Sequence, residues 1–553
     1  MRLIINKVLK LVRSVKRGVQ SVASSLGSDG RTVLAQRAAG LIQLNLLSRC
    51  REVAAVPAAR KVLVDGLWDN ANYWTRFAIV RRALALDGAV EVGILGQYSR
   101  KRSRAAFVAF GISEVIDLKQ RSRPRRYLGQ AKNLLKGINS ANELLQLSLP
   151  MDFPSNIFFD GVLKRQRRST VDITDPDLPI YLAELLALLE AANEIMIDGE
   201  FELVILSHAL DITYGAIAWA AIGQGIRVLT LYGEYGHTRF FQLKKPEDLF
   251  MYPSRPTLAE LGSMSEERAL SLRTMGSQLL AARLGGRTSD VGAIFAYQKR
   301  QGSTNREEIA KRFGWEASKP IIGVYNSNWF DYPHSQGLHD FRDFLDWILT
   351  TLEIAKTRPE INWLFKAHPC DDWYAKINGQ RLSDLVAEID QPHIRLADKN
   401  WNGSDLMRSL DGIVTCHGTI GIEATSQSIP VLVPYTGWYG HAGFVSCAKS
   451  REDYINRLQT SWWQKQDLNV NREKAELFAG WVFCVPEWYA NCVFPDDSRQ
   501  DEIYFGLDEF LQSNRAVLAR ESDEIAAWYA DGHPYYHVFV MMRSRNFQLG
   551  NLR

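Results

Sequence analysis

Residues 411–433 constrain the fold of this chain more strongly than any other part of the sequence. The β-branched run 413–415 predicts a buried strand that ends at Gly418. Residues 420–426 then suit a short helix, and residues 431–433 predict a second buried strand. At the start of such a helix, free backbone N–H groups and the positive end of the dipole favour an anion such as phosphate. The segment therefore predicts a unit of strand, helix and strand with an anion site at its glycine turn.

Two side chains of this unit are candidates for binding the anion and what is attached to it. Thr419 either caps the helix or donates its hydroxyl to the ligand. Glu423 lies about one turn further along the same face, where it can accept hydrogen bonds from ribose hydroxyls. The alternative is an ordinary crossover whose threonine only caps a helix.

Polar side chains also follow a second predicted strand. Residues 361–365 form a mostly apolar predicted strand and lead into Lys366, His368 and Pro369. Lys366 offers a point charge and His368 a ring donor for phosphate, while Pro369 fixes the turn that stops the strand. In a doubly wound sheet, ligands bind outside the carboxyl ends of the strands. Polar groups at two such strand ends therefore predict one shared ligand site.

In these motifs the chain resembles the capsule polysaccharide biosynthesis glycosyltransferases of bacteria, which include the Kdo transferases that use a CMP-activated sugar. The resemblance rests on Lys-Ala-His-Pro at 366–369, on Gly-Thr-Ile-Gly-Ile-Glu-Ala at 418–424 followed by Ile-Pro-Val-Leu-Val, and on their spacing. It covers residues 319–458 well and the N-terminal half in outline. It implies an α/β, GT-B-like fold, in which two Rossmann-like domains face a cleft and the C-terminal domain holds the nucleotide.

The resemblance also implies the substrates. A nucleotide-sugar is the donor, a glycan or glycolipid of surface polysaccharide is the acceptor, and no cofactor or metal takes part. Bacterial sialyltransferases also carry a His-Pro motif near the nucleotide phosphate, which favours CMP. Their second motif is usually a pair of serines or threonines, whereas this chain has a single Thr419 after Gly418, so the donor nucleotide stays open. The one Asp-x-Asp, at 175–177, contains a proline and predicts a turn rather than a metal site.

The N-terminal half supplies the candidate catalytic groups, because these must face the nucleotide from the opposite domain. His208 and Asp211 follow one predicted strand, and Glu234, with His237 behind it, follows the next. Sugar transfer needs a carboxylate that takes the acceptor's proton, or that stabilises or attacks the anomeric centre. Asp211 is the first candidate, ahead of Glu234 and His208. The alternative is that Asp211 caps a helix and Glu234 is a solvated loop acid.

Three more polar residues at predicted strand ends are candidates for holding the acceptor or the sugar. Asp65 ends the first strand of the N-terminal half, while Asn326 and Asn328 follow the first strand of the C-terminal half. Their carboxylate and amide groups can grip hydroxyl or phosphate oxygens.

The order of elements predicts four regions. Residues 1–50 form a basic amphipathic segment, 51–300 an N-terminal Rossmann-like acceptor domain with a surface insertion near 150–179, 301–480 a nucleotide-sugar domain, and 481–553 a helical extension. Predicted strands lie near 62–64, 90–95, 115–118, 203–206 and 228–231 in the first domain, and near 321–325, 363–365, 394–396, 413–415 and 431–433 in the second.

Composition favours a cytosolic enzyme. The 553 residues are long enough for two or three domains, and 46% hydrophobic with 23% charged residues is ordinary for a globular protein. No apolar run approaches the ~20 residues that span a bilayer. The six cysteines include no C-x-x-C pair, so neither a disulfide framework nor a zinc site is predicted.

The first fifty residues carry nine Lys or Arg against one acid, within a net charge of +4. Their apolar residues recur at helical spacing. The segment is therefore expected either to bind the anionic inner face of the cytoplasmic membrane or to dock on the body of the protein. Other basic runs are irregular and lack interleaved aromatics, so we expect no nucleic-acid partner.

Three functions remain open at this point. The first is a glycosyltransferase of surface-polysaccharide assembly with a CMP-Kdo-like donor. The second is a CDP-polyol phosphotransferase of the teichoic-acid type, which a catalytic pair of histidines and a phosphodiester product would identify. The third is a catalytically silent GT-B scaffold that binds an acidic glycan or the membrane, which nucleotide binding without turnover would indicate.

Overall fold

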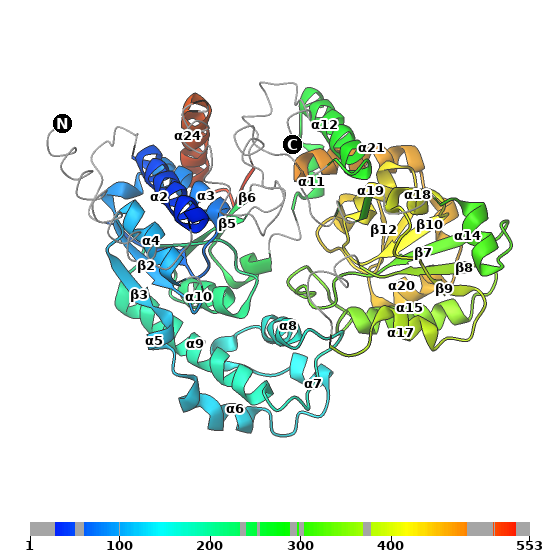
Figure 1. Ribbon diagram of the computed structural model, residues 1–553, viewed down its shortest axis with the longest axis horizontal. Coiled ribbons are helices and arrows are strands. Elements are labelled where there is room, and N and C mark those ends of the chain that lie inside the picture. Colours follow the sequence, from blue (N-terminus) through cyan, green and yellow to red (C-terminus); the bar gives the residue numbers. More distant parts are fainter. Residues whose placement is uncertain are drawn as a thin grey trace.

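The computed structural model describes residues 28–49, 60–98, 100–232, 239–250, 255–287, 304–368, 378–483 and 515–537, with a few single positions between them. Two sheets form the centres of two α/β units, and helix α8 lies between them (Figure 1). The two-domain α/β class predicted from the sequence is confirmed.

The first sheet has seven strands in the order β13-β6-β5-β4-β1-β2-β3. Strands β1 to β5 run parallel, β6 is antiparallel to β5, and β13 is antiparallel to β6. The part β3-β2-β1-β4-β5 has Rossmann-like order, so its topological switch point lies between β1 and β4. The strands are β1 (Lys61–Gly66), β2 (Val90–Leu95), β3 (Glu114–Asp117), β4 (Leu203–Leu206), β5 (Arg227–Tyr232), β6 (Arg239–Leu243) and β13 (Tyr535–His537).

The second sheet has six parallel strands in the order β12-β11-β10-β7-β8-β9. This is the order of a complete Rossmann fold, with the switch point between β7 and β10. Helices cover such a sheet on both faces, which is why β7, β10 and β11 are buried at every residue. The strands are β7 (Ile321–Tyr325), β8 (Asn362–Lys366), β9 (Ile394–Leu396), β10 (Gly412–Thr415), β11 (Val431–Val433) and β12 (Ser446–Cys447).

The α-helices fill the connections between these strands. They are α2 (Ser28–Ser48), α3 (Ala71–Ala83), α4 (Arg100–Phe110), α5 (Leu118–Arg121), α6 (Leu128–Leu134), α7 (Ala141–Leu145), α8 (Ser155–Gln166), α9 (Leu178–Gly199), α10 (Ile212–Gly223), α11 (Leu258–Gly262), α12 (Glu266–Leu284), α14 (Arg306–Phe313), α15 (Phe344–Lys356), α17 (Leu382–Ala387), α18 (Gly403–Arg408), α19 (Ile420–Ser426), α20 (Arg451–Leu458), α21 (Leu468–Val482) and α24 (Arg515–Asp531).

The connection from β3 to β4 is a helical insertion that includes α6 to α9. The sequence predicted a surface insertion near 150–179, but α8 lies in that range and is buried, with Phe158, Phe159 and Asp160 fully inaccessible. Its apolar side chains join a core that also contains Trp329 and Trp363 of the second unit. The insertion is therefore a part of the contact between the two units, because its apolar residues need a surface to cover them.

Segments on either side of the second unit pack differently from the domain boundaries that the sequence predicted. Helix α12, which lies in the predicted N-terminal domain 51–300, packs on α21 and α19 of the second unit. At the crossing, a Cβ added to Gly276 would lie 1.9 Å from the carbonyl oxygen of Glu476, so only glycine allows this approach. After α21, the chain returns to the first unit, where α24 packs on α3 and β13 joins β6.

Of the predicted basic amphipathic segment 1–50, residues 1–27 lie outside the described residues, and residues 28–48 form α2, which packs on α3 and α4. Across the helices that the structure does describe, none combines the length and the apolar character needed to cross a bilayer.

Candidate functional site

Asp65 occupies the switch point of the first sheet. It follows the core residues of β1 and is 1% exposed. Its Oδ1 accepts a hydrogen bond from the backbone N–H of Leu67 at 2.8 Å, and its Oδ2 accepts one from Ser207 N–H at 2.9 Å. The carboxylate therefore joins the ends of β1 and β4. Burial raises the pKa of Asp65 to about 6, although the two backbone N–H groups oppose this shift.

This raised pKa predicts a pH dependence of stability. The unfolded chain titrates Asp65 near 3.8, so the folded state holds this proton more tightly. The stabilisation is fully present below pH 4 and is lost as pH rises through 6. Relative to an Asp65→Asn variant, the wild type should lose roughly 2–3 kcal/mol of unfolding free energy between pH 4 and pH 7. Urea unfolding of both proteins across this range measures the difference, and a constant difference would contradict the shift.

His208 and Asp211 lie at the carboxyl end of β4, next to Asp65. Leu210 N–H donates to Nδ1 of His208 at 3.2 Å, so a neutral ring carries its proton on Nε2. Burial lowers the pKa of His208, and the nearby charge of Asp211 opposes this shift. Asp211 is the N-cap of α10: its Oδ1 accepts from Thr213 N–H at 2.7 Å and Tyr214 N–H at 2.9 Å. The capping role that the sequence left open is thus present. Glu234 and His237 lie outside the described residues.

At the second sheet, the structure brings the predicted phosphate ligands to one edge. Lys366 ends β8, with its Nζ 5.7 Å from the ring centroid of Tyr325, and His368 follows two residues later. The backbone N–H of Asn326 donates to the carbonyl oxygen of Lys366 at 3.0 Å, so the ends of β7 and β8 lie side by side. Pro369 is outside the described residues.

His417, which the sequence reasoning did not single out, follows the end of β10 by two residues at the same edge. Its Nδ1 lies 2.6 Å from the hydroxyl oxygen of Tyr435. Burial lowers the pKa of His417 to about 4; Asp331 opposes this shift and the positive charge of His368 adds to it. The ring is therefore neutral at neutral pH, and it lies close enough to His368 for the two side chains to interact electrostatically. The polar pair Cys-His directly after a predicted strand was the available signal.

The glycine turn after β10 has a different side-chain arrangement from the one expected. Thr419 precedes α19 but makes no capping hydrogen bond, so its hydroxyl does not serve the helix. Glu423 is 1% exposed and accepts from Arg283 Nε at 3.1 Å, from Arg283 Nη2 at 3.0 Å and from the Tyr297 hydroxyl. Glu423 therefore bonds to Arg283 and Tyr297 of this chain, where the sequence predicted ribose hydroxyls. This follows because every residue of α19 is buried and Glu423 faces α12.

The loop from Asn326 to Arg342, which follows β7, holds an unusual group of polar atoms. In the part of the chain that the structure describes, six buried side-chain atoms between Tyr325 and His334 have no hydrogen-bond partner. They are Tyr325 Oη, Asn326 Oδ1, Asn326 Nδ2, Ser327 Oγ, Trp329 Nε1 and His334 Nε2. A buried polar group without a partner costs free energy, so such groups are rare in folded proteins. Their concentration beside the switch point distinguishes this loop from the rest of the described chain.

Helix α8 connects this loop to the first unit. Asp160 is fully buried and accepts from the backbone N–H groups of His334 and Ser335, both at 3.0 Å, while its Oδ1 lies 2.7 Å from His334 Nδ1. The adjacent Gly161 abuts α10, because an added Cβ would lie 2.2 Å from Cδ1 of Ile212. One turn of α8 therefore touches both the loop after β7 and the helix that Asp211 caps.

Together these residues make an edge that suits a phosphate with an attached polar group. Lys366 and His368 can supply charge, Thr419 a hydroxyl, and Asn326 and Ser327 both donors and acceptors. The predicted Asn328 lies in the same loop and is 9% exposed. Within the described ranges, no group of three His, Cys, Asp or Glu side chains is arranged to hold a metal ion.

A search of solved structures finds proteins that are similar to this chain at low sequence identity. No protein-family model and no curated protein sequence matches it significantly. One matched structure, KpsC from Thermosulfurimonas dismutans, a beta Kdo 2,4 transferase, is 14% identical and covers 51% of this chain and 79% of its own, with a TM-score of 0.32.

Two further matches cover more of this chain. The UDP-GlcNAc 2-epimerase of Neisseria meningitidis is 14% identical, covers 77% of this chain and 96% of its own, and has a TM-score of 0.22. The glycosyltransferase SnogD from Streptomyces nogalater is 12% identical, covers 84% and 100%, and has a TM-score of 0.23. Sugar transferases, a Kdo transferase among them, are thus among the structures that this chain is similar to.

Proposed function

We propose that this protein is a glycosyltransferase that moves a sugar from a nucleotide donor to a glycan or glycolipid acceptor. The observation that carries the proposal is the group of six partnerless polar atoms between Tyr325 and His334. They lie at the carboxyl end of β7, beside the switch point where doubly wound folds bind nucleotides. Each of these atoms is buried, so a ligand rich in hydroxyl and phosphate oxygens would reach them, and supply the hydrogen bonds that the chain itself does not, only after the loop has moved.

In this proposal the second sheet holds the donor. Lys366 and His368 bind the phosphate, with Thr419 donating its hydroxyl, since the latter makes no helix cap. Asn326, Ser327 and Asn328 bind the sugar. The resemblance of Lys-Ala-His-Pro and of the glycine turn to the capsule family supports CMP and an acidic sugar of the Kdo type as the first donor to test, and surface polysaccharide as the product.

The acceptor then lies against the carboxyl edge of the first sheet. The Oδ1 atom of Asp211 accepts the hydrogen bonds of the helix cap, and within the described residues its Oδ2 has no hydrogen-bond partner. That oxygen takes the proton of the acceptor hydroxyl, whose oxygen bonds to the anomeric carbon. The bond from this carbon to the phosphate oxygen breaks, and its electron pair leaves with the nucleotide. His208, with its proton on Nε2, donates a hydrogen bond rather than acting as the base.

Calorimetry with CMP, CDP, UDP and GDP tests the donor site. An Asn326→Ala variant, a His368→Ala variant and a Thr419→Val variant should each weaken binding of the preferred nucleotide or nucleotide-sugar by about 10-fold or more, the effect of one hydrogen bond to a charged group.

Asn362 provides a matched control for this measurement. It is also buried, at 2% exposure, and its Nδ2 also lacks a partner among the described residues, but it begins β8 at the opposite edge of the sheet. An Asn362→Ala variant should bind nucleotide as the wild type does. Unchanged affinity in all three site variants would remove the proposed donor site, and nucleotide binding without any turnover would favour the non-catalytic scaffold.

One observation favours a second candidate, the CDP-polyol phosphotransferase. His368 and His417 interact electrostatically at the ends of β8 and β10, as a reaction that uses two histidines requires. Against it, His417 is bonded to Tyr435 and stays neutral. The product decides: a phosphotransferase forms a phosphodiester that retains donor phosphorus, whereas a glycosyltransferase forms a product without it.

A further inference from the structure

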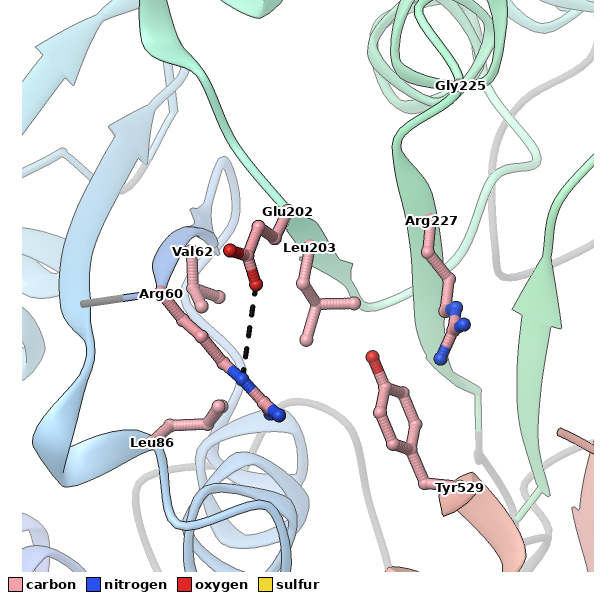
Figure 2. A pocket seen from close by; sticks show the side chains of 8 residues that line it. All are labelled: Arg60, Val62, Leu86, Glu202, Leu203, Gly225, Arg227 and Tyr529. Atoms are coloured by element: carbon pink, nitrogen blue, oxygen red, sulfur yellow. Dashed lines mark ion pairs between the residues drawn. The ribbon is translucent and has the colours of Figure 1, made fainter. Parts of the chain in front are cut away.

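A cavity lies away from the proposed donor site, at the amino ends of β1, β4 and β5 (Figure 2). Its volume is about 320 Å³, within the range of small-molecule sites. Three side chains from the core, Val62, Leu86 and Leu203, make an apolar floor. The cavity is independent of the proposed donor site, since it belongs to the opposite edge of the other sheet.

The rim of this cavity is cationic. Arg60 precedes β1 and Arg227 begins β5, and Figure 2 shows the hydroxyl of Tyr529 from α24 between their side chains in this view. The guanidinium of Arg227 lies 4.9 Å from the Tyr529 ring centroid. Among the described residues it has neither an ion pair nor a hydrogen-bond acceptor. Its N–H groups are therefore available to a ligand that enters the cavity.

Glu202 is the one acid at the rim, and it does not neutralise the site. Its Oε2 lies 3.9 Å from Nε of Arg60, beyond hydrogen-bond distance, and the two side chains are 61% and 44% exposed. Such exposed pairs contribute little and rearrange easily. Two guanidinium groups with one weakly held carboxylate leave the rim positive.

We propose that this cavity binds a small phosphate monoester. Such a group carries close to two negative charges at neutral pH, which matches two guanidinium groups, and guanidinium pairs with phosphate through parallel hydrogen bonds. Because Tyr529 comes from α24 and Arg227 from β5, the ligand contacts both and holds the C-terminal helix on the first sheet.

Titration calorimetry with phenyl phosphate tests the site on the full chain. Arg227→Gln keeps a polar side chain, although a shorter one, and removes its charge, so it should weaken binding at least 10-fold, whereas Glu202→Gln should leave binding equal or tighter. Arg312→Gln is the control, because Arg312 is an exposed arginine of the second unit paired with Asp398. The His368→Ala variant should bind phenyl phosphate at this site unchanged, which separates it from the donor site.

Hydrogen exchange gives a second readout. At a phenyl phosphate concentration about 100 times Kd, opening of α24 should be on the order of 100-fold rarer, so its amides should exchange more slowly. The same slowing should be lost in Arg227→Gln. Absence of binding to the wild type, or equal binding to the wild type and Arg227→Gln, would overturn the proposal.

Discussion

An Asp160→Ala variant is expected to lose about 3–5 kcal/mol of unfolding free energy, the scale of breaking a buried charged group's hydrogen bonds. Asp160 is fully buried and satisfies two backbone N–H groups and the Nδ1 of His334. Alanine would leave all three without an acceptor and release the loop after β7 from α8. A large fall in the thermal midpoint, measured by scanning calorimetry, checks this expectation.

A nearby ion pair offers the control for this variant. Lys164 and Asp331 join the same helix and loop at 3.3 Å, but Asp331 is 51% exposed. Asp331→Ala should therefore cost less than about 1 kcal/mol. Equal losses in the two variants would mean that burial of Asp160 does not decide its contribution.

The second large effect concerns turnover and rests on the proposed function. An Asp211→Asn variant keeps an oxygen that can accept the N–H groups of Thr213 and Tyr214, so α10 stays capped. It loses the group that can take a proton. Turnover should fall by ~10²-fold or more, the usual effect of removing a general base, while nucleotide affinity and thermal midpoint stay near those of the wild type. Release of free nucleotide in the presence of acceptor measures kcat.

Comparison with Asp211→Ala separates catalysis from capping. Alanine also removes the cap, so this variant alone should lose about 1 kcal/mol of stability. If Asp211→Asn turns over normally, Asp211 is only a cap, and Glu234 becomes the residue to test.

The sequence predicted the centres of both sheets but missed β6, β12 and β13, of which β12 and β13 are edge strands. Runs such as residues 413–415 and 431–433 are buried on both faces, so their composition alone indicates strands. The strands β12 and β13 span two and three residues, which is too short to show a period in the sequence. Strand β6 was missed because the sequence just before Arg239 shows no strand pattern. The burial of α8 depends on a partner surface in the other unit, which local sequence does not contain.

The same distinction applies to the candidate site. Lys366, His368, Thr419 and Asn326 could be placed at one edge from the sequence, because strand ends in parallel sheets meet there. The pairing of Asp160 with His334 could not, since these residues are 174 positions apart. Glu423 was assigned to the ligand face by helical spacing, but spacing selects no face in a helix that is buried all round.

The last strand of the first sheet also affects how this protein is made. Strand β13 pairs with β6, and α24 buries Ile525 and Trp528 against the first unit. A ribosome that adds ~5–20 residues per second needs roughly 15–60 s to reach Tyr535 after it has made Leu243. During that time β6 has an unpaired edge, the kind of surface that invites aggregation. The second unit, encoded later, therefore has all its described strands available before the first, and a nascent chain needs its β6 edge shielded until β13 has been made.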